Sequence, residues 1–311
     1  MSLIRKAYPE DFELIYPLLK EFDAKGMTAE RWKLLFVKHW ATEEDYVGYV
    51  LIDHNVAFGF IGCVFSQRTI NGNNEKFCGL SSWIVHPDYR SESLLLLSEV
   101  LRLKNYTITS YTSIPEAAEI LKKLRFKILD TSYLWFPSSM PMFRTSGNIN
   151  FITNTNEVRD FLTGHDKKIF EDHIHFNAEH VIMVNGKESC YVIFKKIPFY
   201  RRKLINVRFV YYLNRIWKIL TGNSFLDAEV MVARIHYTSN REMFRKFLPA
   251  VIKKMNKDYH LKGVVIERRF IKGKTKCFGY VSMPQISLYK SATLDPDQID
   301  SLYTELFVLD Y

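Results

Sequence analysis

The sequence predicts an α/β protein with mixed sheets (α+β), made of two modules in tandem. Its 311 residues are about twice the length of an ordinary domain. Hydrophobic residues make up 47% of the chain and charged residues 25%, which is enough apolar material for two cores. Apolar patterns of strand and helix period recur in both halves, and a polar segment rich in Pro, Ser, Thr, Asn and Gly separates them. We therefore expect domains at residues 1–138 and 156–311, with a linker at 139–155.

The composition argues against a secreted or membrane-spanning protein. The most apolar stretch, residues 47–65, is interrupted by Asp53, His54 and Asn55, and it is better explained as two strands and a turn than as a span. The N-terminus has no apolar core followed by small residues, so we expect no signal peptide. The four cysteines are far apart and form no Cys-x-x-Cys pair. These features predict buried thiols in a reducing, cytoplasmic location.

The positive charge of the chain lies in its second half. The formal net charge is +9, and residues 146–311 hold 26 of the 43 basic residues but only 17 of the 34 acidic ones. Such asymmetry predicts either an anionic partner for this half or a basic surface with no specific partner. Basic clusters alternate with aromatic side chains there, for example at residues 199–203, so nucleic acid is one candidate partner. The phosphates of a nucleotide cofactor are another.

The first half alternates strands and helices around a central run of strands. Proline and two acids at 9–11 open an apolar pattern at helical spacing, as is typical of a helix N-terminus. Because helices separate the strands only after a central meander, we expect a mixed sheet. The expected elements are, in order, strand 3–6, helix 9–22, helix 28–36, strands 47–52, 56–65 and 77–85, helix 93–103, strand 106–111, helix 115–124 and strand 127–135.

The second half partly repeats this order of elements without a repeat of individual residues. Asn185-Gly186 predicts a tight hairpin turn between two strands. Residues 206–212 fit a strand or the start of a helix that runs to 220. The other expected elements are helix 157–176, strands 180–184, 190–196 and 229–237, helix 241–257, strands 264–268 and 277–288, and helix 296–307.

Residues 82–90 read Ser-Trp-Ile-Val-His-Pro-Asp-Tyr-Arg and are followed by a predicted helix. This stretch resembles the central signature of the acyl-CoA N-acyltransferase (GNAT) superfamily, in which a strand ends at Val-x-Pro and leads through a glycine-rich loop into a helix. Residues 4–11 are similar to the first strand and helix of that family, and residues 115–126 are similar to its late helix. The resemblance covers about residues 3–136. It implies a GNAT fold, in which backbone amides at a helix N-terminus bind the pyrophosphate of coenzyme A.

The resemblance also implies positions for the cofactor in this module. Backbone N–H groups near Ile84 and Val85 would meet the thioester oxygen, and Arg90, Ser91 and Ser93 would lie at the phosphates. The chain departs from the family at this loop, because serine and leucine replace the small residues that let the backbone approach a phosphate. Leu121 stands where many members have the tyrosine that protonates the thiolate. The first module is therefore expected to bind coenzyme A weakly, or to have lost this function.

The second module offers a comparable strand-to-helix junction. Ser239, Asn240 and Arg241 lie where the cofactor loop would be if this half is also GNAT-like, and they are good helix caps and phosphate ligands. Glu229 and His236 lie on the preceding predicted strand and are our candidate catalytic bases, since such a group removes a proton from the attacking amine. The alternative is an ordinary capped helix with a paired glutamate and a strand-end histidine.

A metal site is not expected. His173, His175 and His180 include a His-x-His pair, but no carboxylate or cysteine completes a set at a familiar spacing. The resemblance thus favours an N-acyltransferase, most simply an acetyltransferase, that uses acetyl-CoA or another acyl-CoA and a small-molecule or sugar amine. Two alternatives stay open: a transferase that uses aminoacyl-tRNA, and a non-catalytic binding module with a degenerate acyltransferase fold. The sequence does not distinguish them, nor does it give the oligomeric state.

Overall fold

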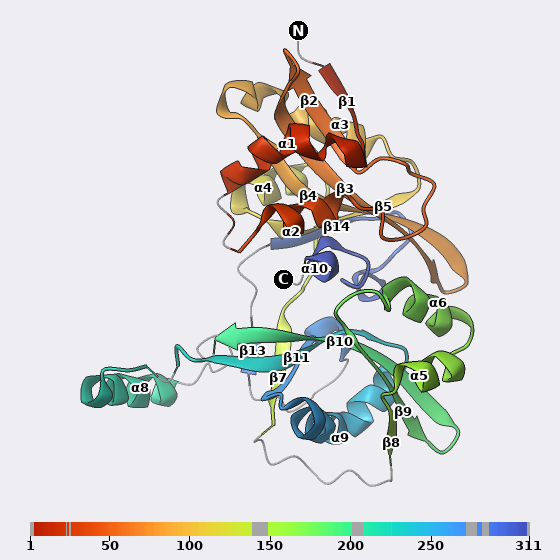
Figure 1. Ribbon diagram of the computed structural model, residues 1–311, viewed down its shortest axis with the longest axis vertical. Helices are drawn as coiled ribbons and strands as arrows, with labels where there is room; N and C mark the ends of the chain where they lie inside the picture. The colour runs from red at the N-terminus through yellow and green to blue at the C-terminus, as the bar shows by residue number, and fades with distance from the viewer. Residues whose placement is uncertain are drawn as a thin grey trace. The chain divides into compact units, whose positions relative to one another are not determined.

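The protein divides into two α/β units, each built around one seven-stranded mixed sheet. The computed structural model describes residues 3–22, 24, 26–138, 149–200, 208–224, 226–271, 279–281 and 286–309. The first unit comprises residues 1–129 and 285–311, and the second comprises residues 130–284. Figure 1 shows the two sheets and the helices around each of them. Most of the expected linker, residues 139–148, lies outside the described part.

The first sheet has the strand order β1-β2-β3-β4-β5-β14-β6. Its neighbours pair antiparallel except for β4 and β5, which run parallel. The strands are β1 (Leu3–Ala7), β2 (Gly48–Asp53), β3 (Val56–Ile70), β4 (Asn73–Val85), β5 (Tyr106–Ser113), β6 (Lys127–Ile128) and β14 (Ile286–Lys290). The helices of this unit are η1 (Pro9–Asp11), α1 (Phe12–Leu19), η2 (Lys20–Phe22), α2 (Ala29–Lys33), η3 (Leu34–Phe36), η4 (Pro87–Glu92), α3 (Ser93–Leu101), α4 (Pro115–Lys123), η6 (Pro296–Gln298) and α10 (Glu305–Val308).

The second sheet has the order β8-β9-β10-β11-β12-β7-β13 and again contains one parallel pair, β11 with β12. Its strands are β7 (Tyr133–Pro137), β8 (Asn150–Ile152), β9 (Glu179–Asn185), β10 (Glu188–Tyr200), β11 (Glu229–Thr238), β12 (Gly263–Glu267) and β13 (Gly279–Val281). Its helices are α5 (Thr155–Phe161), α6 (Gly164–His173), α8 (Arg208–Thr221), α9 (Arg241–Tyr259) and η5 (Arg268–Phe270). Residues 208–212 of the ambiguous segment 206–212 begin a helix, because their apolar residues recur at helical spacing, and residues 206 and 207 lie outside the described part.

The two sheets correspond strand for strand, and each takes one strand from the other half of the sequence. In the first sheet β14, near the C-terminus, lies between β5 and β6. In the second sheet β7, from the first half, occupies the same place between β12 and β13. The units therefore differ from the expected linear domains at 1–138 and 156–311. The reason is that a strand pairs with whichever edge matches its apolar residues, irrespective of distance along the chain.

Each sheet buries a separate core. In the first unit, α3 and α4 pack on a face that includes Leu96, Leu121 and Leu288, which are at most 1% exposed. In the second unit, α9 covers a face that includes Phe136, Phe247 and Ile266, also at most 1% exposed. Leu288 and Phe136 belong to the two exchanged strands, so each core depends on a residue from the other half of the chain.

Candidate functional site

A cleft opens in the first unit where β4 and β5 separate. The two parallel strands pair from Lys76 and Tyr106 to Gly79 and Thr109, and both then continue without pairing to each other. The cleft has a volume of about 110 Å³. Its lining comes from both strands, α4 and η2: Phe22, Leu80, Ser81, Ser82, Trp83, Ser110, Thr112, Ser113, Ile114, Ala117 and Leu121.

The backbone of β4 is irregular at this cleft. Phe60 pairs with Ile84 and Gly62 with Ser81, so two residues of β4 oppose one residue of β3. Ser82 lies within this bulge with a φ of 51°, in the left-handed region. A bulge turns backbone groups out of the ladder. The irregular backbone is therefore at Ser82 and Trp83, two residues before the Ile84 and Val85 that the sequence suggested.

Two polar side chains of the bulge lack hydrogen-bond partners among the described residues. The Oγ atom of Ser81 and the Nε1 atom of Trp83 are both buried. Gly62 lets Ser81 lie this close to β3, because a Cβ atom there would come within 2.5 Å of the Ser81 Oγ. Buried polar groups without partners are uncommon in folded proteins, and they point to a ligand or water in the cleft.

Glu305 lies beside β4 at the residue where its pairing with β5 ends. The residue is 2% exposed, and no side chain among the described residues forms a hydrogen bond with its carboxylate oxygens. Its Oε2 atom is 3.6 Å from the place that a Cβ atom would occupy on Gly79, the last residue of β4 that pairs with β5. The backbone amide of Tyr111, between the cleft-lining Ser110 and Thr112, interacts with the same carboxylate. Burial raises the pKa of Glu305 from 4.5 to about 7.

The sequence reasoning missed Glu305. The available signal was a single acid within the apolar run 302–309, since a charge there is costly to bury without a purpose. What brings it to β4 is the exchanged segment, because α10 follows β14 in the chain.

We expect Glu305→Gln to stabilise the protein at alkaline pH. The folded pKa of about 7 exceeds the ordinary 4.5, so the folded state binds the proton more tightly, and stability falls as the pH rises from 4.5 through 7. The difference corresponds to roughly 3 kcal/mol at most. Urea unfolding at pH 5 and pH 8 tests this: the advantage of the variant should be present at pH 8 and largely absent at pH 5. An equal difference at both values would contradict the assignment of this pKa.

The expected phosphate loop of the first unit is a short 3-10 helix, η4. The amide of Tyr89 donates to the carbonyl of His86 at 2.9 Å, and the amide of Ser93 donates to the carbonyl of Arg90. Arg90 and Ser91 are exposed, and Ser93 is half-buried. The backbone amides of Tyr89 and Ser93 thus donate to carbonyls within the helix, whereas the amides of a glycine-rich loop would donate to phosphates. The residues of this loop therefore fit a diphosphate poorly.

In the second unit, the parallel strands β11 and β12 likewise stop pairing part-way along β11. Its pairing with β12 ends at Ile235 and Ile266, and its next residue, His236, is an extra residue opposite β10. His236 is 1% exposed, and burial together with Arg234, Lys195 and His173 lowers its pKa well below 6.5. The ring is therefore neutral near pH 7.

The structure does not bring Glu229 and His236 together. Glu229 is exposed at the start of β11, and His236 lies seven residues further along the strand. At about 3.3 Å per residue, their backbones are roughly 23 Å apart. A shared role in one proton transfer is therefore unsupported.

The predicted phosphate ligands of the second unit surround an open depression at the N-terminus of α9. The Oγ atom of Ser239 accepts a hydrogen bond from the amide of Tyr191 at 2.9 Å, and the Oδ1 atom of Asn240 accepts from the amide of Met243 at 2.9 Å. The Arg241 guanidinium lies 4.5 Å from the centre of the Phe270 ring. These side chains have structural contacts, so they cap the helix as well as facing the depression.

The histidines of the second unit also have structural contacts. The Nδ1 atom of His173 lies 2.8 Å from the carbonyl of Ile169, and the Nδ1 atom of His180 lies 2.6 Å from the hydroxyl of Tyr191. Burial lowers the pKa of His180 to about 4. Within the described ranges, no group of three His, Cys, Asp or Glu side chains is placed to hold a metal ion.

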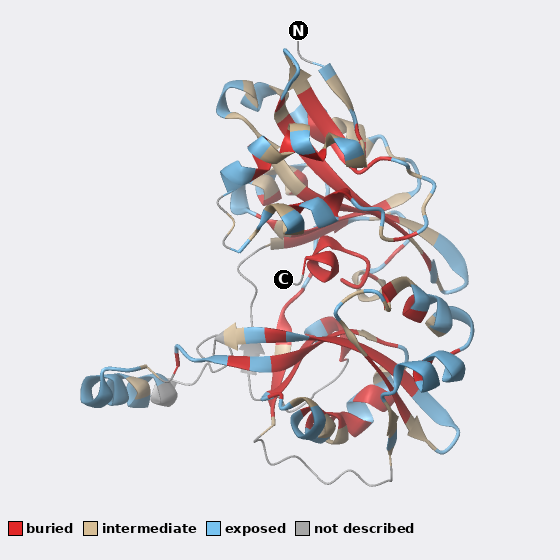
Figure 2. Ribbon diagram, viewed as in Figure 1, coloured by how far each residue is buried: buried red, intermediate tan, exposed pale blue. Residues whose placement is uncertain are grey.

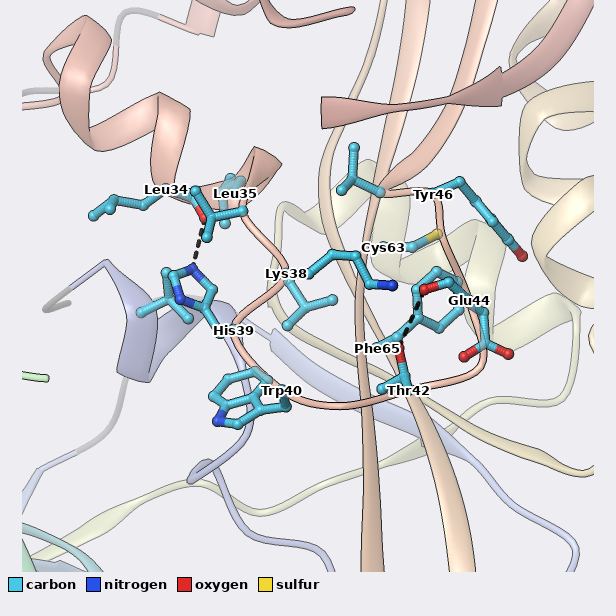
Figure 3. A pocket seen from close by; sticks show the side chains of 14 residues that line it. Leu34, Leu35, Lys38, His39, Trp40, Thr42, Glu44, Tyr46, Cys63 and Phe65 are labelled. Carbon is cyan, nitrogen blue, oxygen red and sulfur yellow. Dashed lines mark hydrogen bonds between the residues drawn. The ribbon is translucent and has the colours of Figure 1, made fainter. Parts of the chain in front are cut away.

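A second cavity in the first unit is too small for a substrate. Figure 3 shows it between the segment 34–47 and β3, with Lys38 and Glu44 among its lining. Its volume is about 20 Å³, which is room for a single water molecule. The cleft between β4 and β5 is therefore the better candidate site.

Comparison with solved structures decides the fold. A GCN5-related N-acetyltransferase from Kribbella flavida aligns over 93% of this chain and 70% of its own, with a TM-score of 0.55 and 12% identity. The chain has the GNAT fold. A GCN5-related N-acetyltransferase from Anabaena variabilis ATCC 29413 aligns over 93% of this chain and 72% of its own (TM-score 0.52, 12% identity). A probable N-acyltransferase from Enterococcus faecalis V583 aligns over 94% and 72% (TM-score 0.54, 10% identity).

The GNAT fold thus extends over both units, as the matching strand orders of the two sheets require. No protein-family model matches the sequence, and no curated protein matches it. No helix in the described part of the chain is both long and apolar enough to cross a membrane.

Proposed function

We propose that the protein transfers an acyl group from a coenzyme A thioester to an amine, with the cleft of the first unit as the reaction site. The observation that carries this proposal is Glu305, a buried carboxyl group that no side chain among the described residues binds, beside the point where β4 and β5 separate. A general base works best when its pKa lies near the pH at which it acts, and the pKa of Glu305 is raised to about 7.

In this mechanism the Glu305 carboxylate accepts a proton from the attacking amine. The nitrogen forms a bond to the thioester carbon, and the carbon–sulfur bond breaks to release the thiolate. The backbone of the bulge at Ser82 and Trp83 would stabilise the negative charge that develops on the carbonyl oxygen. Leu121 lines the cleft and cannot donate a proton, so the thiolate would be protonated by water or by Glu305 itself.

The position of the diphosphate is a separate part of the proposal. Arg90, Ser91 and Ser93 would hold it beside the first cleft, and Ser239, Asn240 and Arg241 would hold it in the second unit. The 3-10 helix η4 weakens the first alternative, because its amides are already engaged. Acetyl is the simplest acyl group, and a small-molecule amine is the simplest acceptor.

Titration calorimetry with acetyl-CoA tests this proposal. We expect micromolar binding with one site per chain. Arg90→Ala should weaken binding at least tenfold if the first unit holds the diphosphate, and Arg241→Ala should do so if the second unit holds it. If acetyl-pantetheine binds as tightly as acetyl-CoA, neither loop holds the diphosphate.

A complete lack of binding to short and long acyl-CoA would contradict the acyl-CoA proposal. The alternatives would then be aminoacyl-tRNA as donor or a binding module without catalysis. Salt-dependent binding of aminoacyl-tRNA would favour the first of these, because phosphate contacts weaken as salt rises.

A further inference from the structure

Helix α8 carries an unusual number of exposed apolar side chains. Figure 2 shows it in the colour of exposed residues along most of its length. The exposed fractions of Ile219 and Leu220 are 77% and 76%, the largest among the large hydrophobic residues described. Its exposed apolar residues are Tyr211, Tyr212, Leu213, Ile216, Trp217, Ile219 and Leu220. An exposed apolar patch of this kind marks a surface that binds something.

Except for Tyr211, which lies between Arg215 and Lys218, the exposed apolar residues of α8 lie on a different side from its polar residues. Leu213, Ile216 and Leu220 are spaced by three and four residues, so they share one side of the helix. At 100° per residue, Arg215 and Lys218 lie on the other side. So does Asn214, whose Oδ1 atom accepts a hydrogen bond from the amide of the buried Leu226 at 3.1 Å. The polar side thus connects the helix to the following segment, and the apolar side is left exposed.

The charged residues of α8 have a single sign. Residues 208–221 contain Arg208, Arg215 and Lys218 and no Asp or Glu. Two of these cations, Arg215 and Lys218, are exposed. A partner that fits this surface must therefore be both apolar and anionic.

We propose that α8 binds the surface of an anionic phospholipid membrane, lying in the plane of the interface. The acyl chains would take up the aliphatic side chains, Trp217 and Tyr212 would lie at the headgroup level, and the cations would meet lipid phosphates. At 14 residues the helix is about 21 Å long, which is too short to span a bilayer.

Two other occupants fit this surface less well. Nucleic acid would meet the cations and stack on Tyr212 and Trp217, but it offers nothing apolar to Ile219 and Leu220. A second copy of α8 would cover the apolar side but would give Arg215 and Lys218 no anionic partner, because α8 contains no Asp or Glu. An anionic bilayer satisfies both sides of the helix.

Vesicle flotation of the full chain tests the proposal. The probes are vesicles of pure phosphatidylcholine and vesicles that contain 30% phosphatidylglycerol. We expect binding only to the anionic vesicles, with a blue shift of Trp217 fluorescence that Trp217→Phe abolishes. The double variant Arg215→Gln/Lys218→Gln should lower the partition coefficient about 25-fold, since each cation near the surface contributes about fivefold. Ile219→Asp/Leu220→Asp should lower it more than a hundredfold.

Matched substitutions elsewhere control for general effects of charge. Val56→Asp changes an apolar residue that is 52% exposed in another part of the chain, and Lys187→Gln removes an exposed cation from the β9–β10 turn. Both controls should float like the native protein. The absence of vesicle binding would overturn the proposal, as would equal binding to neutral vesicles. Nucleic-acid binding or dimer formation that the aspartate pair abolishes, without vesicle binding, would assign α8 to those partners instead. None of these readouts depends on acyl transfer.

Discussion

Replacing Glu305 with glutamine is expected to lower the rate of acyl transfer by about 100- to 10,000-fold, the usual contribution of a positioned general base. Glutamine keeps the shape of the side chain but cannot accept the amine proton at neutral pH. The measurement is thiol release from acetyl-CoA in the presence of an amine acceptor found by screening. Glu116→Gln, which removes an exposed carboxylate from α4 of the same unit, should leave the rate unchanged.

The pH dependence makes this prediction specific to proton transfer. With an acceptor that is neutral across the range, such as an aniline, kcat/KM of the native protein should rise with pH and level off above about 7, where Glu305 is ionised. The variant should lose this rise. Because the substitution is expected to stabilise the fold at pH 8, a loss of activity there would not reflect unfolding. Full activity of Glu305→Gln with an unchanged pH profile would rule out Glu305 as the base.

The second large effect concerns the exchanged strands. A fragment of residues 1–138, the first domain that the sequence alone suggests, should fail to fold because β5 and β6 do not pair with each other and need β14 between them. The fragment also lacks Leu288, which is fully buried in the core of this unit. We expect no cooperative unfolding transition by circular dichroism and poorly dispersed amide resonances in nuclear magnetic resonance spectra.

A rearranged chain provides the control for this experiment. Joining residues 286–309 through a flexible linker to the end of residues 1–129 restores every described strand of the first sheet, and this chain should unfold cooperatively. In the full protein, Leu288→Ala should cost about 2–5 kcal/mol. It should also speed amide hydrogen exchange in β5 and β6, which pair with β14 although both are far from residue 288 in the sequence. Cooperative folding of the 1–138 fragment alone would contradict the conclusion that the first sheet requires β14.

Local patterns were sufficient to predict most elements of the fold. The turn at Asp53-His54-Asn55, the Asn185-Gly186 hairpin and the strand before His86-Pro87 all depend on short-range sterics and hydrogen bonds, and each lies where the sequence placed it. The same patterns, with the resemblance at residues 82–90, were enough to predict the GNAT fold. They also showed that the expected phosphate loop has no glycine, and the structure forms a 3-10 helix there.

The sequence by itself therefore determined the fold class and most of the elements, because periodicity and turn chemistry act between near neighbours. The expected strands 127–135 and 277–288 were wrong, because each falls on two strands that belong to different sheets. Only the tertiary structure decided which strands share a sheet, since pairing between residues 109 and 289 leaves no mark in local sequence. For the same reason it separated Glu229 from His236 along β11 and brought Glu305 beside Gly79. The burial that raises the pKa of Glu305 comes from this long-range packing, so no local pattern could have identified it.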